Sequence, residues 1–294
     1  TGCSSGIGRH TIEALLNRGY NVIATSRKQE DVECLRSAGF NSFQLDVTCD
    51  NSIQKALEKI LTHTNGTLYA LFNNSGYGLR GAVEDLPTQV LRDQFETNFF
   101  GMHALTKKVI PIMRAQGYGR IIQNSSLMGF VGLKYRGAYT ASKYAMEGWS
   151  DVLRQELAGS GIHVSLIQTG PVLSTNFRKN SMPAFKGSVD LRKSVHNSGY
   201  KKMIEQQKST RPMNFSVSAD AISSQVIHAL ENPRPKVRYR VGFPVHLFAI
   251  MKSILPNYLM DYLLVNWSHS FFTVKITQTN TWGAKTKVNA SSQL

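Results

Sequence analysis

The sequence of 294 residues predicts an α/β protein with a doubly wound parallel sheet in three layers. Short apolar segments alternate with helical patterns from the first residues onward, and a glycine-rich turn at residues 1–8 opens the first helix. Parallel strands need a crossover helix between them, so this alternation favours a parallel sheet with helices on both faces. With 41% hydrophobic residues, a chain of this length can bury a large core.

Each predicted helix is followed by a short apolar strand. The predicted helices are residues 7–18, 29–38, 52–61, 139–158 and 218–230, together with a long helical region that follows Pro87, reaches about residue 115 and is interrupted near Gly101. The predicted strands are residues 21–25, 42–46, 68–72, 120–124, 163–167 and 237–241. A central strand precedes the glycine-rich turn in a doubly wound sheet, so we expect the first strand to be truncated here, upstream of Thr1.

Three regions are predicted along the chain. Residues 1–242 form a dinucleotide-binding catalytic domain, in which residues 171–216 have no strong periodicity and are expected to be an irregular lid or a surface loop. Residues 243–267 form an apolar extension, broken by Pro244 and Pro256, that packs on the substrate side. Residues 268–294 are polar and are predicted to be a disordered tail.

The composition excludes some classes of function. The formal net charge of +15 suits a protein that binds nucleic acid or an anionic membrane, and it equally suits an enzyme that binds an anionic cofactor. The sequence has no zinc pattern, RNA-binding aromatic motif or basic helix with heptads, so we expect no nucleic-acid partner and no metal site. The three cysteines lack metal-ligand spacing and favour a cytoplasmic protein. The sequence contains no run of about 18 uncharged apolar residues, so it predicts no membrane-spanning helix.

A tyrosine and a lysine four residues apart are the main catalytic candidates. Tyr139 and Lys143 share one face of a predicted helix, and Ser126 lies where a buried strand runs into a loop. A fixed ammonium group lowers the pKa of a neighbouring phenol from about 10, so the pair can act as a general acid or base near neutral pH. The serine hydroxyl could hold the oxygen that is protonated. The same spacing also occurs on solvated helix faces, so other motifs of the chain must decide between a catalytic pair and a solvated face.

Glycines and polar residues at the strand ends predict a dinucleotide site. Glycines let the turn approach a pyrophosphate at a helix N-terminus. The candidate contacts in the turn are Gly2, Ser4, Ser5, Gly6, Ile7 and Gly8, and those after later strands are Asp46, Val47, Asn73, Ser75 and Gly76. Ordinary turn chemistry is the alternative for the strand ends.

The residue after the second strand decides between two cofactors. An acidic side chain there would bind the ribose hydroxyl of NAD, whereas a basic one favours the 2′-phosphate of NADP. The chain has Thr25, Ser26, Arg27 and Lys28 at this point, with no acid. Arg27 can bind phosphate through its planar guanidinium group, so we predict NADP(H) over NAD(H). Lys28 fits a solvated surface residue equally well.

Together these residues resemble the short-chain dehydrogenase/reductase family, in its single-domain branch. The resemblance is carried, up to about Val241, by Thr-Gly-x-x-x-Gly-Ile-Gly at residues 1–8, Asp46-Val47, Asn73-Asn74-Ser75-Gly76, Asn98, Ser126, Tyr139 and Lys143. The region through residues 258–260 is also similar to bacterial NADP-dependent aldehyde reductases and to retinol and 17β-hydroxysteroid dehydrogenases. The resemblance implies a Rossmann-type sheet.

The resemblance also implies roles for these residues. Tyr139 would protonate the carbonyl oxygen, Lys143 would lower the phenol pKa and bind the nicotinamide ribose, and Ser126 would orient the carbonyl. Asn98 would sustain a water relay towards Lys143, or alternatively only bend its helix.

Two departures from the family pattern affect cofactor contacts. Ser75 replaces the usual alanine, and Thr169-Gly170-Pro171-Val172 replaces the usual Pro-Gly. Gly170 and Val172 are still expected beside the nicotinamide, and Ser174 or Thr175 beside a phosphate.

The expected function is hydride transfer between NADP(H) and an apolar aldehyde, ketone or secondary alcohol. Aromatic and methionine residues in the lid favour an apolar substrate. The alternatives are a catalytically silent dinucleotide-binding protein of the same fold, and an epimerase or dehydratase acting on a sugar nucleotide. The extension at 243–267 predicts cover of the substrate site, a dimer contact or peripheral membrane contact. A homo-oligomer is implied by analogy with the family.

Overall fold

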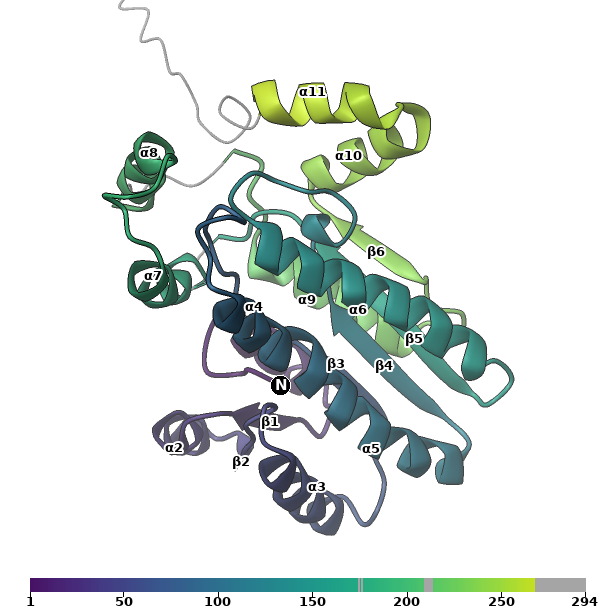
Figure 1. Cartoon of the computed structure of the whole chain (residues 1–294). Coiled ribbons are helices and arrows are strands. Elements are labelled where there is room, and N and C mark those ends of the chain that lie inside the picture. The colour runs from purple at the N-terminus through teal and green to yellow at the C-terminus, as the bar shows by residue number, and fades with distance from the viewer. Residues whose placement is uncertain (174, 176, 209–213, 268–294) are drawn as a thin grey trace, which may run out of the picture.

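The computed structural model describes residues 1–173, 175, 177–208 and 214–267. The candidate Ser174 and the predicted tail at 268–294 lie outside these residues. Helices and strands alternate along the chain (Figure 1) in the order α1 (Gly6–Leu16), β1 (Ile23–Ser26), α2 (Gln29–Ser37), β2 (Asn41–Gln44), α3 (Asp50–His63), β3 (Ala70–Asn73), α4 (Thr88–Phe95), the π-helix η1 (Glu96–Phe100), α5 (Gly101–Gln116), β4 (Gly119–Asn124), the 3₁₀-helix η2 (Leu127–Gly129), α6 (Gly137–Glu156), β5 (Ile162–Thr169), α7 (Phe177–Ser188), α8 (Asn197–Lys208), α9 (Ala219–Glu231), β6 (Arg238–Val241), α10 (Phe243–Ile254) and α11 (Asn257–Trp267).

The described strands form two parallel sheets. β1 pairs with β2, and β3, β4, β5 and β6 pair in that order. The first residues of the chain lie between the two sheets, because the Thr1 nitrogen donates to the Phe72 carbonyl of β3 at 2.9 Å. On the other side, the Cys3 amide donates to the Thr25 carbonyl of β1 at 3.0 Å. The glycine-rich turn is therefore bonded to both sheets.

Helices cover both faces of the larger sheet. On one face α3, α5 and α6 pack against it through a buried cluster that includes Val109, Ile121 and Leu153. On the other face α9 packs against it through a cluster that includes Ile122 and Val226, with α1 beside α9. The neighbours Ile121 and Ile122 of β4 thus enter different cores, as alternating side chains of a buried strand do. The predicted three-layer α/β fold of Rossmann type is confirmed.

The prediction that residues 171–216 are irregular is wrong, because the segment contains α7 and α8. Figure 1 shows both helices beside the main body. They share a buried apolar cluster with the loop after β3, formed mainly by Ala82, Phe185, Tyr200 and Met203. The Tyr200 hydroxyl also accepts from the Ala82 amide at 2.8 Å. These tertiary contacts stabilise helices that show no strong periodicity in the sequence.

The long helical region after Pro87 runs through α4, η1 and α5, and its predicted interruption is the π-helical turn directly before Gly101. A Cβ atom on Gly101 would stand 2.6 Å from the Val47 carbonyl oxygen. Only glycine therefore lets this helix pack so closely against the chain after β2.

The segment 243–267 folds into α10 and α11, which are separated at Pro256. Phe248 and Met260 of this helix pair pack in one cluster with Leu127 and Val131, which follow Ser126 along the chain. Among the described helices, none combines the length and the apolar character needed to cross a bilayer.

Candidate active site

The candidate residues gather where β3 and β4 end. Parallel strands end at the same edge of a sheet, and Asn73 and Asn124 are the last residues of these two strands. The side-chain nitrogen Nδ2 of Asn124 donates to the side-chain oxygen of Asn74 at 2.7 Å, and this bond joins the two strand ends. The Asn73 side chain instead donates to the Thr106 hydroxyl of α5 at 2.9 Å. Only the backbone of Asn73 is therefore available for contact with a cofactor.

Tyr139 and Lys143 lie one turn apart on α6, and each is only 6% exposed. The Lys143 Nζ donates to the Asn124 carbonyl at 2.6 Å and lies 5.8 Å from the centre of the Tyr139 ring. The end of β4 thus holds the ammonium group beside the tyrosine. The burial of both side chains rules out the alternative of a solvated helix face.

Ser126 joins this pair from the loop after β4. It caps the short helix η2, where its hydroxyl accepts from the Met128 amide at 3.2 Å. The same side chain hydrogen-bonds the Tyr139 phenol. The structure therefore brings together the three predicted residues Ser126, Tyr139 and Lys143.

Burial raises the pKa of the Tyr139 phenol above 10.0, and the hydrogen bond with Ser126 and the charge of Arg136 only oppose this rise. The expectation of a lowered pKa for Tyr139 is therefore wrong in direction for this arrangement. Burial removes the hydration of the phenolate, and the neighbouring groups do not stabilise the phenolate enough to offset this loss. At neutral pH the phenol keeps its proton and can act as a donor.

Burial also lowers the pKa of Lys143, from 10.5 to about 8. The desolvated ammonium group is the less favoured form in an apolar surrounding. The negative charge of Glu147, one turn further along α6, opposes this effect. Lys143 thus keeps its charge at neutral pH and loses it in mildly alkaline solution.

Asn98 is fully buried in the π-helix η1. Its side-chain oxygen accepts from the Tyr77 amide at 3.1 Å, and its nitrogen donates to the Tyr77 carbonyl at 2.9 Å and to the Ser142 hydroxyl at 3.2 Å. Ser142 in turn donates to the Tyr139 carbonyl at 2.8 Å. Asn98 therefore joins the loop after β3 to the helix that carries Tyr139, and its π-helical turn also alters the helix path as the second alternative expects.

The glycine turn leaves space and amide donors at the N-terminus of α1. Gly2 has a φ of +66°, in the left-handed region that favours glycine. A Cβ atom on Gly8 would collide with the Gly2 carbonyl oxygen. Ser5, the N-cap residue, makes no side-chain capping bond, so its hydroxyl does not block the first amides. These features fit a pyrophosphate at this position.

The other predicted cofactor contacts are divided between the edge and the core. The side chains of Ile7 and Val47 pack in core clusters, so these residues face the edge through their backbone. Ser4 is exposed on the turn, and the Ser75 amide donates to the Thr1 hydroxyl at 2.9 Å. Three further residues lie at the edge or beside the lid: Gly76 next to Asn98, Gly170 bonded to Val241, and Val172 bridged to Val217.

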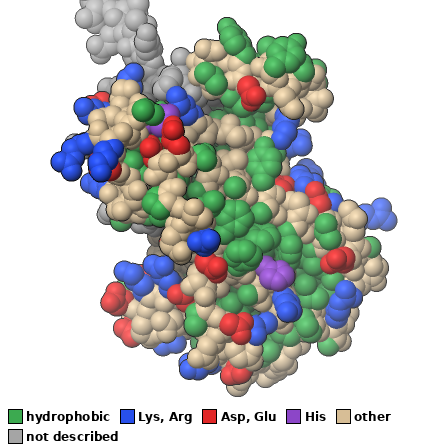
Figure 2. All heavy atoms as spheres, in the orientation of Figure 1, with side chains coloured by type: hydrophobic (Ala, Val, Ile, Leu, Met, Phe, Trp, Pro, Cys, Tyr) green, Lys and Arg blue, Asp and Glu red, His purple; other side chains and the backbone are tan. Residues whose placement is uncertain are grey.

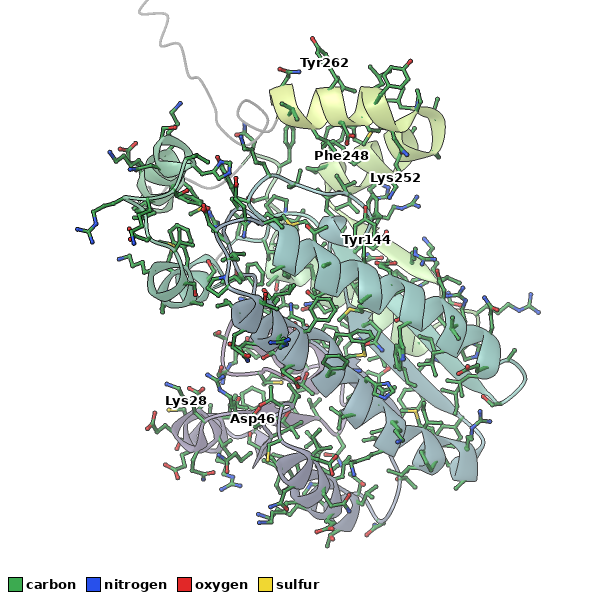
Figure 3. The ribbon with its side chains drawn as sticks, viewed as in Figure 1. Lys28, Asp46, Tyr144, Phe248, Lys252 and Tyr262 are labelled. Atoms are coloured by element: carbon green, nitrogen blue, oxygen red, sulfur yellow. The ribbon has the colours of Figure 1, made fainter. Side chains whose placement is uncertain are left out.

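Basic residues follow β1. Arg27 and Lys28 are exposed, and the charge of Arg27 opposes a rise in the pKa of Tyr77, which places Arg27 towards the loop after β3. Within the described residues the buried Ser26 hydroxyl has no hydrogen-bond partner. Asp46 follows β2, near Lys28 in Figure 3, and its carboxylate accepts from the Thr48 amide (3.0 Å) and hydroxyl (2.7 Å). The basic pair with a free hydroxyl beside it fits an adenosine ribose that carries a phosphate.

The segment at 171–216 reaches Tyr139 through Phe177 of α7. The two ring centres are 5.4 Å apart in an edge-to-face contact, and a Cβ atom on Gly78 would collide with the Phe177 ring. Thr175 lies against the glycine turn, where a Cβ atom on Gly6 would stand 3.3 Å from its methyl group. Of the two predicted phosphate contacts, Thr175 therefore lies beside the turn.

Sequence reasoning missed Phe177, Glu147 and Tyr77. In the sequence Phe177 is only one of several aromatic residues in a segment without periodicity, so its contact with Tyr139 could not be predicted. Tyr77 contributes backbone atoms, which leave no signal in the sequence. Glu147 follows Lys143 by one helical turn, and this spacing could have indicated that it shares the buried face.

Residues 1–184 match the family model for short chain dehydrogenases. The uncharacterized oxidoreductase YbbO of Escherichia coli strain K12 is 38% identical over 264 residues, covering 90% of this chain and 92% of the relative. The 3-ketodihydrosphingosine reductase of Bacteroides thetaiotaomicron is 34% identical over 268 residues, covering 90% and 94%. Human retinol dehydrogenase 8 is 36% identical over 184 residues, covering 59% and 58%.

Solved structures share the fold. A short-chain dehydrogenase from Streptomyces avermitilis has a TM-score of 0.70 at 26% identity, covering 91% of this chain and 94% of its own. One from Burkholderia cenocepacia in complex with NADP has a TM-score of 0.69 at 23% identity, covering 90% and 95%. One from Burkholderia phymatum in complex with NAD has a TM-score of 0.71 at 19% identity, covering 89% and 92%. By the family match and the near full-length relatives, this chain belongs to the short-chain dehydrogenase/reductase family of oxidoreductases.

Proposed function

We propose that this chain is an NADP(H)-dependent oxidoreductase that interconverts an apolar aldehyde or ketone and the corresponding alcohol. The observation that carries the proposal is a buried phenol, Tyr139, which is hydrogen-bonded to Ser126, lies beside Lys143 and is covered by Phe177. The bound cofactor supplies or accepts the hydride. The chain supplies the proton and holds the reacting groups.

In the reductive direction Tyr139 donates its proton to the carbonyl oxygen of the substrate. Because burial raises its pKa, the phenol is fully protonated at neutral pH and ready to donate. Ser126 offers a second hydroxyl to the same oxygen. Lys143 carries three N–H donors, of which one is bound to the Asn124 carbonyl and one points to the Met146 sulfur at 3.9 Å, so a third is available for a ribose hydroxyl. Its charge favours the phenolate that remains after proton transfer.

The preference for NADP(H) over NAD(H) rests on Arg27. A guanidinium group after β1 complements the 2′-phosphate, and the carboxylate that would suit an unmodified ribose is replaced here by Arg27 and Lys28. One structural neighbour is described with NADP and another with NAD, so these neighbours do not decide between the cofactors.

An apolar substrate is supported by the lid. Phe185, Val189 and Met203 form its buried interior, and Phe177 presents a ring to the catalytic tyrosine. Two relatives are named for 3-ketodihydrosphingosine and retinol, and both molecules have a long hydrocarbon portion. The lid at 171–216 belongs to a catalytic domain of residues 1–242, and the extension at 243–267 covers its substrate side.

The test is NADPH oxidation by purified protein against aldehydes, retinoids, steroids and long-chain ketones, with Tyr139→Phe as the matched control. We expect turnover with at least one apolar carbonyl compound and its loss in Tyr139→Phe. Cofactor binding without turnover across the panel would instead support the silent dinucleotide-binding protein. Tightly retained cofactor that is regenerated in each cycle would support an epimerase or dehydratase, an alternative that the apolar lid disfavours.

A membrane-surface role is supported by the exposed side of α10 and α11. Ile254 and Tyr258 are more than 70% exposed, and Tyr262 and Val265 of α11 are each 65% exposed. Figure 3 shows Tyr262 projecting from α11. Exposed aliphatic residues with tyrosines suit the interface of a bilayer. We expect wild-type protein to float with liposomes and a variant with Ile254→Glu and Tyr258→Glu to remain unbound. Equal flotation of both proteins would contradict this role for a protein that we otherwise place in the cytoplasm.

A homo-oligomer is supported by a second apolar surface. Figure 2 shows hydrophobic side chains gathered over α4 to α6, and the exposed ones there include Leu91, Phe100 and Val152. Such a surface is suited to pairing with a second copy of the chain. Light scattering measures the oligomeric state of the wild type and of Phe100→Glu directly.

A further inference from the structure

A buried carboxylate lies directly behind the catalytic residues. Glu147 is only 7% exposed, although it carries a charge and sits one turn after Lys143 on α6. Burying a carboxylate is costly unless it is paired and hydrogen-bonded. A charge placed here therefore needs a compensating set of contacts.

Three elements supply these contacts. The Ser125 hydroxyl, from the loop after β4, donates to Glu147 Oε1 at 2.5 Å. The Gln168 side chain of β5 donates to the same oxygen at 3.0 Å, and the Arg238 guanidinium group of β6 donates to Oε2 at 2.9 Å. The carboxylate thus binds the catalytic helix to three neighbouring segments.

Ser125 immediately precedes the catalytic Ser126, so its bond to Glu147 fixes the backbone that presents the Ser126 hydroxyl. Space for this bond is provided by Gly129, since a Cβ atom there would stand 2.7 Å from the Ser125 hydroxyl oxygen and 2.9 Å from the Glu147 Cγ. The loop that carries Ser126 is therefore built around the Glu147 carboxylate.

The carboxylate also acts on the charge of Lys143. It favours the ammonium form, in opposition to the burial that disfavours it. The charged groups around this carboxylate are Lys143 and Asp151 on its own helix and Arg238 on β6. Arg238 also binds Asp151 at 2.7 Å, so part of its charge is balanced away from the catalytic residues.

We propose that Glu147 is a positioning residue that fixes Ser126 through Ser125 and keeps Lys143 charged. This inference rests on the function proposed above, in which Ser126 and Lys143 serve the reaction. Glu147 does so without touching the substrate or the cofactor.

The first test compares Glu147→Gln, Ser125→Ala and Asp151→Asn in steady-state kinetics across pH. Losing a hydrogen bond to a charged group is worth about tenfold or more in rate, so we expect kcat to fall by that factor in Glu147→Gln and Ser125→Ala, with little change in KM. Only Glu147→Gln should shift the alkaline loss of activity to lower pH. Asp151→Asn removes a carboxylate from the same helix and the same arginine, and it should resemble the wild type.

A second measurement needs no turnover. Protein carrying ¹³Cε-labelled lysine is titrated by NMR, and Lys143 is assigned by its absence in Lys143→Arg. We expect the Lys143 midpoint to fall in Glu147→Gln and to stay unchanged in Ser125→Ala and Asp151→Asn. If the wild type lacks turnover but the midpoint falls, the proposed function fails while the contact to Lys143 holds.

An unchanged midpoint and unchanged kcat in Glu147→Gln would overturn the inference. Thermal unfolding shows whether each variant is folded. If Glu147→Gln does not fold, Ser125→Ala and Glu147→Asp carry the test, because the aspartate keeps the charge but is too short to reach Ser125. Both should then lower kcat and leave the Lys143 midpoint in place, and wild-type kcat in both would contradict the proposal.

Discussion

The ring of Phe177 lies edge to face against the ring of Tyr139, with 5.4 Å between their centres. The two residues come from α7 and from α6, so this contact joins the segment that we propose selects the substrate to the group that we propose donates the proton. Gly78 makes the contact possible, because any side chain there would occupy the place of the Phe177 ring.

Truncating this ring should weaken the binding of apolar substrates. Burying a phenylalanine side chain is worth ~2 kcal/mol, so Phe177→Ala should raise KM for an apolar carbonyl compound by about tenfold or more. Gly78→Ala should have a similar effect because it displaces the ring without removing it. Steady-state kinetics measure both, and an unchanged KM in both variants would show that the ring does not contact the substrate.

Removing the phenol should abolish proton transfer. We expect Tyr139→Phe to lower kcat for carbonyl reduction by about 10² to 10⁴, the usual contribution of a positioned acid. NADPH binding, followed by cofactor fluorescence, should persist because the ring and its packing remain. Retained turnover in this variant would refute the assigned role.

The two directions of the reaction should depend differently on pH. The pKa of Tyr139 is raised, so the phenol is protonated at neutral pH and reduction should proceed there without an alkaline requirement. Alcohol oxidation needs the deprotonated phenol, and its rate should therefore increase as pH rises above 7, until Lys143 begins to lose its charge at a pH of about 8. Initial rates in both directions measure this, and an oxidation rate already maximal at pH 7 would contradict it.

Lys143 should make stability depend on pH. Its pKa is about 8 in the folded state and 10.5 in the unfolded reference, so between these values the unfolded state binds the extra proton. The free energy of unfolding therefore gains from this group as pH rises from 8 towards 10.5, by at most ~3 kcal/mol. Lys143→Met should lack this gain and be the more stable protein at pH 7. Urea unfolding at several pH values up to 10 tests the difference, and parallel curves would contradict it.

Arg27 should set the cofactor preference. Arg27→Ala should lower kcat/KM with NADPH by about 10-fold to 100-fold, the value of a charge-assisted contact to phosphate, and leave the value with NADH unchanged. Lys28→Ala is the matched control, and it should behave as the wild type if Lys28 is only a solvated surface residue. Equal losses with both cofactors in Arg27→Ala would assign it another role.

The sequence predicted the alternating elements well because each strand is a short apolar segment between helical patterns. It also identified Ser126, Tyr139 and Lys143, which the structure brings together. It did not predict α7 and α8, since these helices depend on contacts made by Phe185 and Tyr200 with residues distant in the chain. The predicted direction of the Tyr139 pKa shift was wrong, because the shift depends on burial and the spacing of Tyr139 and Lys143 does not reveal burial.

The helix pair α10 and α11 reaches the segments of Ser126 and Lys143 through one side chain. Lys252 of α10 donates to the Phe130 carbonyl at 2.5 Å and to the Tyr144 hydroxyl at 3.1 Å (Figure 3). Phe130 follows the loop of Ser126, and Tyr144 is the residue after Lys143. One side chain of α10 thus holds the chain after Ser126 and the helix of Lys143 together. The position of α10 is therefore coupled, through one ammonium group, to the two segments that carry Ser126 and Lys143.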